Sequence, residues 1–255
     1  MNSYDIKDLQ LAGISWEITD VPAALRAKWN ASSQSPETQK RVNGNISQNT
    51  TVVPPIAPNE TISIETVISM AMRPSNTDNL IRLIKEFNHP LRGAATNVVL
   101  PNIAKNPNGL IIVSDVPGID DDESGCVLSG AAGELLDKML AAIGMGRDTV
   151  SIIPIVFWRT PGGRTPTTEE LSLARPFVDR LLEFLKPRVI LTLGATPATE
   201  IAGIKLTGAH GAINQTANGT PVMSIYHPNY LLLKPSAKRD VWTALQELQN
   251  LLKNQ

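Results

Sequence analysis

The chain has 255 residues, of which 42% are hydrophobic and 18% are charged, and its formal net charge is −1. This composition is typical of a soluble globular protein, and it gives no global attraction to nucleic acid, so any DNA binding needs a local basic patch. The single cysteine, Cys126, excludes an intrachain disulfide and any all-cysteine metal or iron–sulfur site built from this chain.

The same features set expectations for compartment and partners. A lone thiol fits the reducing cytoplasm. No apolar run reaches the roughly 18 residues of a membrane span, and the polar, acidic N-terminus does not look like a signal peptide. We therefore expect a cytoplasmic protein, monomeric, with no membrane contact, no metal and no other cofactor.

The first 61 residues differ in character from the rest of the chain. Residues 1–29 hold two short helix-like pieces, around 6–11 and 21–29, which predict an N-terminal helical segment. Residues 30–61 are dominated by Asn, Ser, Thr, Gln and Pro, and cannot bury enough apolar surface to offset the entropy of ordering them. The pattern predicts a disordered linker before a folded domain over 62–255.

The folded part alternates between two kinds of pattern. Helical patterns fill 62–88, and four short apolar runs follow at 110–113, 150–156, 189–193 and 222–225, separated or followed by helix-like segments at 131–143, 168–185 and 240–252. This alternation predicts an α/β fold: a three-layer α/β/α domain with a central, mostly parallel, four-stranded sheet. Ligands bind at the carboxyl ends of the strands in such sheets, so the loops there are candidates for chemistry.

The loop after the first run begins Ser114-Asp115-Val116-Pro117-Gly118. Pro and Gly force a tight turn, which should bring the Asp115 carboxylate and several backbone N–H groups to the ligand-binding edge. A plain strand–helix loop with a turn-capping Asp is the alternative. The acidic run at 120–123 is more typical of a solvated loop than of a site for a hard cation.

Arginines mark the loop after the second run, where Arg159 and Arg164 flank a Gly- and Pro-rich stretch. Arginine forks suit phosphate, so the loop is a candidate contact to a DNA backbone. Helix capping, or pairing with nearby acids, is equally open for both. After the third run, Gly194 permits close backbone approach or the start of a helix.

The fourth run ends at His227-Pro228-Asn229. Because Pro228 keeps the preceding residue extended, the imidazole should lie at the carboxyl end of a buried strand. Beyond it, an apolar knuckle is followed by basic residues, and such wedges can enter a duplex and hold phosphates. An amphipathic lead into the last helix is the alternative. The residues of this candidate contact are Leu232, Leu233, Lys234, Lys238 and Arg239.

Five fragments, at 114–118, 125–137, 159–166, 193–194 and 227–233, resemble in order and spacing the motifs of the uracil-DNA glycosylase superfamily, above all its bacterial and archaeal family-four type. The family reads Gly-Glu-Ala-Pro-Gly, Gly-x-Pro-Phe-Val-Gly before Leu-Leu-Asp, Arg-Pro-Pro-Gly-Asn-Arg-x-Pro, Leu-Gly and His-Pro-Ser-x-Leu-Leu-Arg. The resemblance spans roughly residues 80–252.

The resemblance implies extrusion of uracil from DNA and hydrolysis of its N-glycosidic bond, as in base excision repair. In that chemistry a carboxylate, here Asp115, steadies the cationic sugar and positions water, and a neutral histidine, here His227, donates to the base oxygen where negative charge grows. The implied base pocket comprises Val116, Pro117, Gly118, Leu128, Pro154 and Asn229. The implied DNA contacts are Arg159, Arg164 and the residues from Leu232 to Arg239 named above.

The chain departs from the family at most of these positions. Asp115 replaces Glu, Leu128 replaces the Phe that stacks on the base, and Pro154 replaces the Asn that reads its Watson–Crick edge. In the last motif, Asn229 replaces Ser and Leu233 replaces Arg. The four cysteines of the family's iron–sulfur cluster are absent; the positions that can be aligned carry His89 or Pro90, Trp158 and Ala174.

Three hypotheses follow. The first is a divergent DNA glycosylase that uses Asp115 and His227 on uracil or another damaged base, with weakened or altered activity. The second is a catalytically inactive relative that binds DNA or a protein partner through the same face. The third, a small-molecule or nucleotide hydrolase, has the least support because no Gly-rich phosphate loop or nucleophile elbow is present.

Overall fold

The computed structural model describes residues 62–254. The helical segment predicted over 1–29 and the linker predicted over 30–61 lie outside the described residues. Within 62–254, none of the helices is long and apolar enough to cross a membrane.

A five-stranded sheet with the order β2-β1-β3-β5-β4 forms the centre of the described domain. Its strands are β1 (Leu110–Ser114), β2 (Ser151–Pro154), β3 (Val189–Leu193), β4 (Ile213–Gln215) and β5 (Pro221–Ile225). All neighbours pair in parallel except β4, which runs antiparallel to β5 at the edge. The predicted α/β architecture is confirmed, but the predicted count of four strands is wrong.

The missed strand, β4, has three residues, Ile-Asn-Gln, and is exposed along most of its length. It therefore carries no apolar run that could reveal it in the sequence. The strands that were predicted are rich in β-branched residues, and β1 and β3 are buried along their whole length, as parallel strands covered on both faces require.

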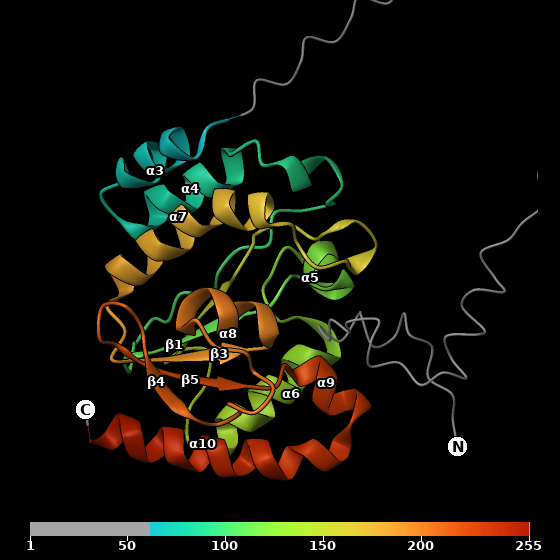
Figure 1. The fold of residues 1–255 in the computed structure, drawn as a ribbon, viewed down its shortest axis with the longest axis vertical. Helices are drawn as coiled ribbons and strands as arrows, with labels where there is room; N and C mark the ends of the chain where they lie inside the picture. The colour runs from blue at the N-terminus through green and yellow to red at the C-terminus, as the bar shows by residue number, and fades with distance from the viewer. Residues whose placement is uncertain (1–61, 255) are drawn as a thin grey trace, which may run out of the picture. The chain divides into compact units, whose positions relative to one another are not determined.

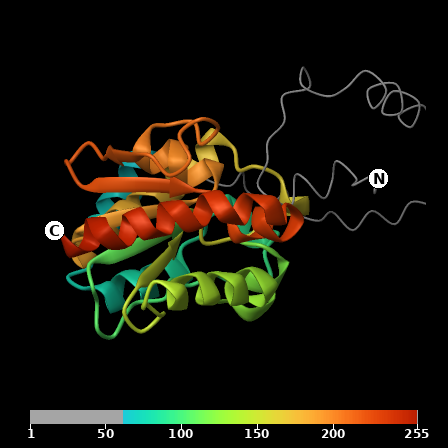
Figure 2. The same cartoon turned by 90° about the horizontal axis from the view of Figure 1, so that it is seen from below.

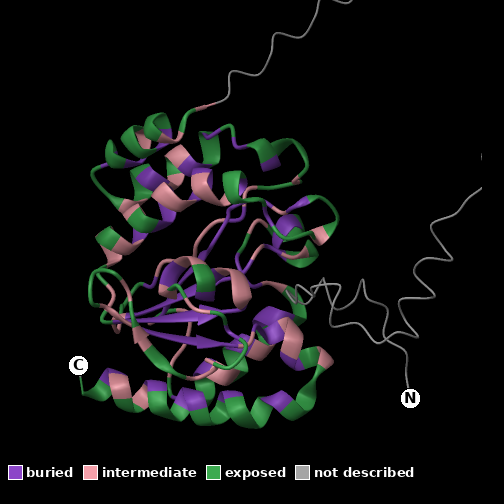
Figure 3. Cartoon of the chain, in the orientation of Figure 1, coloured by how far each residue is buried: buried purple, intermediate pink, exposed green. Residues whose placement is uncertain are grey.

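Helices cover both faces of this sheet (Figures 1 and 2). Leu110 and Ile112 of β1 face a core that is closed by α6 and α10, while the alternate residues of the strand point to the opposite side, toward α7 and α8. Figure 3 shows the strands buried and the outer surfaces of the helices exposed. The helices are α3 (Ile64–Met72), α4 (Thr77–Glu86), α5 (Ile119–Ser124), α6 (Gly130–Ala142), α7 (Thr168–Leu185), α8 (Ala195–Ala202), α9 (Pro228–Leu233) and α10 (Lys238–Lys253), with short 3₁₀ turns η2 (Pro90–Gly93), η3 (Pro161–Gly163) and η4 (Pro235–Ala237).

The strand register places one set of loops at a common edge. Ser114, the last residue of β1, is level with Pro154 of β2 and Leu193 of β3, and Leu193 is level with Ile225 of β5. Four parallel strands therefore end side by side. The loops that follow them meet at this edge, which is where an open α/β sheet binds its ligands.

The acidic run at 120–123 is not the solvated loop that the sequence predicts. It lies in α5, where Asp121 and Asp122 are buried. Asp121 accepts hydrogen bonds from the amides of Gly118 (2.9 Å) and Ser129 (2.6 Å), and Asp122 accepts them from Thr96 and Asn97. These two carboxylates tie loops together, because unpaired amides inside the protein need acceptors.

Candidate active site

His227 caps the helix that follows β5. Its Nδ1 accepts a hydrogen bond from the amide of Asn229 at 3.2 Å, and Pro228 occupies the first helical position, where no N–H is needed. Because Nδ1 is the acceptor, we assign the ring proton to Nε2. That nitrogen faces the hydroxyl of Ser114 at 3.4 Å.

Burial keeps this imidazole neutral. His227 is 8% exposed, and the loss of water around the ring lowers its pKa to about 4. At neutral pH the residue is therefore an uncharged hydrogen-bond donor at the carboxyl edge of the sheet.

Asp115 lies on the same edge, directly after β1. Its Oδ1 accepts a hydrogen bond from the amide of Val116 at 2.9 Å. Burial raises the pKa of the carboxyl group, and the Thr196 hydroxyl and nearby amides, which favour the charged form, only partly oppose this. The Thr196 hydroxyl and the Ala195 and Thr196 amides stand close to the carboxylate, yet Oδ2 is buried and forms no hydrogen bond with any described residue.

The approach of Asp115 to the start of α8 depends on a glycine. Gly194 has a φ of +104°, and a Cβ added there would stand 2.2 Å from the Asp115 Oδ2. Gly194 therefore permits both the backbone conformation and the contact.

Asp115 and His227 line one cavity of about 260 Å³, close to the lower end of the usual range for small-ligand pockets. Its walls come from the loops after β1, β2, β3 and β5. A second hollow of about 360 Å³ also contains His227 and adds Leu232 and Leu233. The first cavity is lined by Asp115, Val116, Pro117, Gly118, Ile119, Arg159, Gly163, Arg164, Thr165, Leu171, Ala195, Thr196, Thr199, Glu200, His227 and Asn229.

Two residues of the implied base pocket lie away from this cavity. Leu128 is 1% exposed and belongs to the hydrophobic core, and Pro154 is buried at the end of β2. Neither side chain lines the cavity or the second hollow. The structure thus brings together Asp115, His227 and four of the six predicted pocket residues, but not these two.

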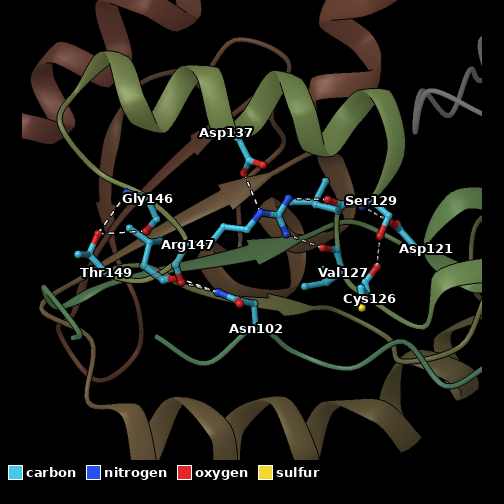
Figure 4. Close-up of polar contacts among 11 residues, drawn as sticks. Asn102, Asp121, Cys126, Val127, Ser129, Asp137, Gly146, Arg147 and Thr149 are labelled. Carbon is cyan, nitrogen blue, oxygen red and sulfur yellow. Dashed lines mark hydrogen bonds and ion pairs between the residues drawn. The ribbon is translucent and has the colours of Figure 1, made fainter. Parts of the chain in front are cut away.

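Leu128 is held in an unusual backbone conformation. Its φ is +52°, a left-handed value that is rare for a large side chain. Figure 4 shows the guanidinium of Arg147, which donates to the carbonyls of Leu128 (2.6 Å) and Val127 (3.0 Å) and pairs with Asp137 at 2.7 Å. The Arg147 carbonyl in turn accepts a hydrogen bond from Asn102. This network fixes the segment that turns Leu128 into the core.

The basic residues do not form one continuous cluster. Arg159 lines the cavity and has no ion pair among residues 62–254. Arg164 also lines it, but its guanidinium is held in a bidentate pair by Glu170. Lys234 lies over the Tyr230 ring with its Nζ 5.8 Å from the centroid. Lys238 and Arg239 are exposed at the start of α10 and line neither cavity.

Ser114 and Thr196 are site residues that the sequence did not single out. Ser114 belongs to the motif at 114–118, but no function was assigned to it from the sequence. It replaces the first glycine of the family motif Gly-Glu-Ala-Pro-Gly, and so adds a hydroxyl group at that position. Thr196 lies two residues after Gly194, in the first turn of α8. Their positions could have pointed to the site: Ser114 is the last residue of the buried strand β1, and Thr196 closely follows the buried strand β3.

The family's iron–sulfur cluster does not fit this chain. Cys126 is exposed and is the only cysteine. The positions that the resemblance aligns with the family's cysteines carry His89 or Pro90, Trp158 and Ala174; the ring of His89 stacks on Trp158, with centroids 4.4 Å apart and planes 5° apart, and Ala174 is buried in α7. No group of three His, Cys, Asp or Glu side chains in the described residues is placed to hold a metal ion.

Comparison with known proteins identifies the family. The sequence model of the family described as "Uracil DNA glycosylase superfamily" matches residues 101–249. The type-4 uracil-DNA glycosylase of Archaeoglobus fulgidus is 29% identical over 184 residues, which cover 68% of this chain and 92% of that protein. The type-4 enzyme of Thermotoga maritima is 30% identical over 65% of this chain and 88% of its own length, and that of Pyrobaculum aerophilum is 32% identical over 58% and 80%. The match spans more than half of the chain, on the fold that the motifs predict: the chain belongs to the uracil-DNA glycosylase superfamily and is similar to its type-4 members.

Proposed function

We propose that this protein is a DNA glycosylase that hydrolyses the N-glycosidic bond of uracil or another damaged base, with Asp115 and His227 as its catalytic groups. One observation carries the proposal: His227, buried and with its Nδ1 bonded to the amide of Asn229, shares a cavity with the buried carboxyl group of Asp115. The relatives named as uracil-DNA glycosylases support the reaction class.

His227 suits the leaving base. Cleavage of the glycosidic bond leaves negative charge on the base, and a neutral Nε2–H can donate to the oxygen where that charge grows without transferring a proton. Its present acceptor, the Ser114 hydroxyl, is 3.4 Å away, which is beyond the usual range for a strong hydrogen bond. Exchanging this long contact for a shorter one to the base costs little.

Asp115 suits the sugar. An ionised carboxylate beside a cationic sugar stabilises the transition state and can orient the attacking water. Since burial raises the pKa of Asp115, the carboxylate is ionised only above that raised pKa. Base release should therefore fall as the pH is lowered through the raised pKa of Asp115, and this fall should begin at a higher pH than it would for an exposed carboxylate.

The pocket for the base is altered. Stacking of a base on an aromatic ring contributes roughly 1–3 kcal/mol, and Leu128 supplies neither a ring nor a wall of the cavity. Pro154 has no amide with which to read a base edge. We therefore propose that activity on uracil is weak, or that another base fits the cavity better.

A catalytically inactive, DNA-binding protein is the second candidate. It is favoured by the same placement of Leu128 and Pro154 outside the cavity, because extrusion of a base costs a few kcal/mol that pocket contacts must offset. In this case the guanidinium of Arg159, which has no ion pair with another described residue, would hold a phosphate at the mouth of a site that performs no chemistry.

The third hypothesis, a small-molecule or nucleotide hydrolase, gains no support from Ser114 as a nucleophile. Ser114 is the serine next to His227, but the assigned tautomer places the proton on the nitrogen that faces its hydroxyl. That nitrogen cannot accept the serine proton, as nucleophilic catalysis would require.

The test is base release from single- and double-stranded oligonucleotides that carry uracil or hypoxanthine, followed by alkaline cleavage at abasic sites. The wild-type protein, His227→Ala and Asp115→Asn are compared, with His210→Ala as a control because His210 lines neither cavity. Release by the wild type and the control, reduced at least 100-fold in the two site variants, supports the glycosylase. Salt-dependent DNA binding with no release from any substrate supports the second candidate.

A further inference from the structure

Five aromatic rings pack together behind the loop that carries Arg159. His89 stacks on Trp158, Phe87 packs edge-on against Phe177 at 4.9 Å and lies 6.1 Å from Trp158, and Phe157 meets Trp158 edge-on at 5.8 Å. None is more than 3% exposed. We call these five residues the aromatic cluster; they come from three segments, the end of α4 and start of η2, the chain after β2, and α7.

Both ring nitrogens of His89 are occupied. Nδ1 accepts a hydrogen bond from the Leu91 amide at 3.1 Å, and Nε2 donates to the Glu170 carbonyl in the first turn of α7 at 3.0 Å. Burial lowers the pKa of His89, which keeps Nδ1 free to accept. His89 therefore connects the segment before η2 to α7 by a hydrogen bond and to Trp158 by its ring face.

Glu170 links the start of α7 to the loop 159–167 through its carboxylate. Its carboxylate accepts two hydrogen bonds from Arg164, one of 2.7 Å, and a third from the amide of Thr167 at 2.7 Å, which completes a capping box at the start of α7. The Arg164 guanidinium holds the pKa of Glu170 below its usual range. Within the loop, the Thr160 hydroxyl donates to the Arg164 carbonyl at 2.6 Å.

The loop 159–167 is thus fixed at both ends. At one end, Trp158 is fully buried in the aromatic cluster and the next residue, Arg159, lines the cavity. At the other end, Glu170 holds Arg164 and Thr167. This side of the cavity is walled by Arg159, Gly163, Arg164 and Thr165. Of the two arginines in the loop, Arg164 is paired with Glu170 and Arg159 has no ion pair with another described residue. The position of the loop therefore decides where the guanidinium of Arg159 stands in the cavity.

We propose that the aromatic cluster and Glu170 act as a metal-independent clamp that positions loop 159–167 against the cavity. His89, Trp158 and Glu170 are its positioning residues. They lie at or near the positions that the resemblance aligns with the cysteines of the family's iron–sulfur cluster, which this chain lacks. The clamp acts on the loop in the absence of DNA, so the inference does not depend on base excision.

The clamp makes a prediction that ordinary core packing does not. A residue that only adds stability, when replaced, lowers global stability and speeds amide exchange throughout the domain by global unfolding. A positioning residue speeds exchange selectively in the loop that it holds. Treatment with a metal chelator, or oxidation of Cys126, should leave amide exchange in the loop unchanged, since neither a metal ion nor Cys126 is part of the clamp.

The experiment is hydrogen–deuterium exchange of the full-length chain, read by mass spectrometry for peptides over 159–167 and over β1 and β3. Glu170→Gln is compared with Glu183→Gln, a matched control on the same helix that breaks the exposed pair with Arg180. We expect exchange in the loop to be about tenfold faster in Glu170→Gln, because charged hydrogen bonds of this kind are the strong ones. We expect a change of less than about twofold in Glu183→Gln, because exposed pairs contribute little.

Two further variants separate ring stacking from bulk. Trp158→Phe keeps an aromatic ring beside His89, and should keep the loop protected to within about threefold, whereas Trp158→Leu removes the stack and should release the loop by about tenfold. The inference is overturned if the loop exchanges at the wild-type rate in folded Glu170→Gln and Trp158→Leu, or if all regions speed up equally. It is also overturned if an iron chelator releases the loop in the wild-type protein.

Discussion

His227 should make the stability of the folded domain depend on pH in a defined window. Its pKa is lowered to about 4 in the folded state and is about 6.5 in an unfolded chain. Between these values the unfolded state binds the additional proton, so stability rises with pH through this window and the contribution is complete above pH 6.5. As the pH falls from 6.5 to 4, the neutral imidazole should cost about 3 kcal/mol of unfolding free energy, at 1.36 kcal/mol per pKa unit.

The assay compares urea unfolding of the wild-type protein and His227→Gln between pH 4 and 7.5. Because the glutamine cannot titrate, the wild type should lose about 3 kcal/mol more than the variant over this range. His89 and His210 also have lowered pKa values, but they are present in both proteins and cancel in the difference. A parallel loss of stability in both proteins would show that His227 titrates normally, and would refute its assignment as a neutral donor.

Three other outcomes follow from the site. Gly194→Ala should destabilise the fold by about 2 kcal/mol or more and displace Asp115, because its Cβ would meet Oδ2 at 2.2 Å in a left-handed backbone; thermal unfolding measures this, and an unchanged melting temperature would contradict it. Arg147→Met should cost about 1–3 kcal/mol by releasing the carbonyl of the strained Leu128, measured by urea unfolding; a neutral result would mean that the left-handed turn needs no support. Arg159→Ala should weaken DNA binding and reduce the slope of log K against log salt by about one; fluorescence anisotropy across a salt series checks it, and an unchanged slope would remove Arg159 from the DNA contact.

The fold could be predicted where the sequence repeats a physical pattern. The buried strands are runs of β-branched residues, and their alternation with helical segments requires parallel crossovers. β4 was missed because three residues at a sheet edge, only one of them apolar, carry no such pattern. The acidic run escaped because carboxylates count as solvated in a sequence, whereas Asp121 and Asp122 accept bonds from backbone amides that the sequence does not show.

The site could be predicted only as far as strand ends determine it. Asp115 and His227 reach one cavity because parallel strands end level at one edge. The positions of Leu128 and Pro154 depend on a left-handed backbone and on which way each side chain turns, and neither is written in local sequence. The sequence left DNA contact and pairing with an acid equally open for Arg164, because the partner, Glu170, is identified only by how the loop folds back onto the start of α7.

We propose that Asp115 and His227 catalyse cleavage of a glycosidic bond in the cavity they share. The most direct test is single-turnover release of uracil and hypoxanthine from a defined oligonucleotide by the wild-type protein and by His227→Ala. We expect measurable release by the wild type, falling as the pH drops through the raised pKa of Asp115, and a loss of at least about 100-fold in the variant. Release that is equally fast in His227→Ala, or absent from the wild type on both bases while DNA binding persists, would contradict this role of the two residues.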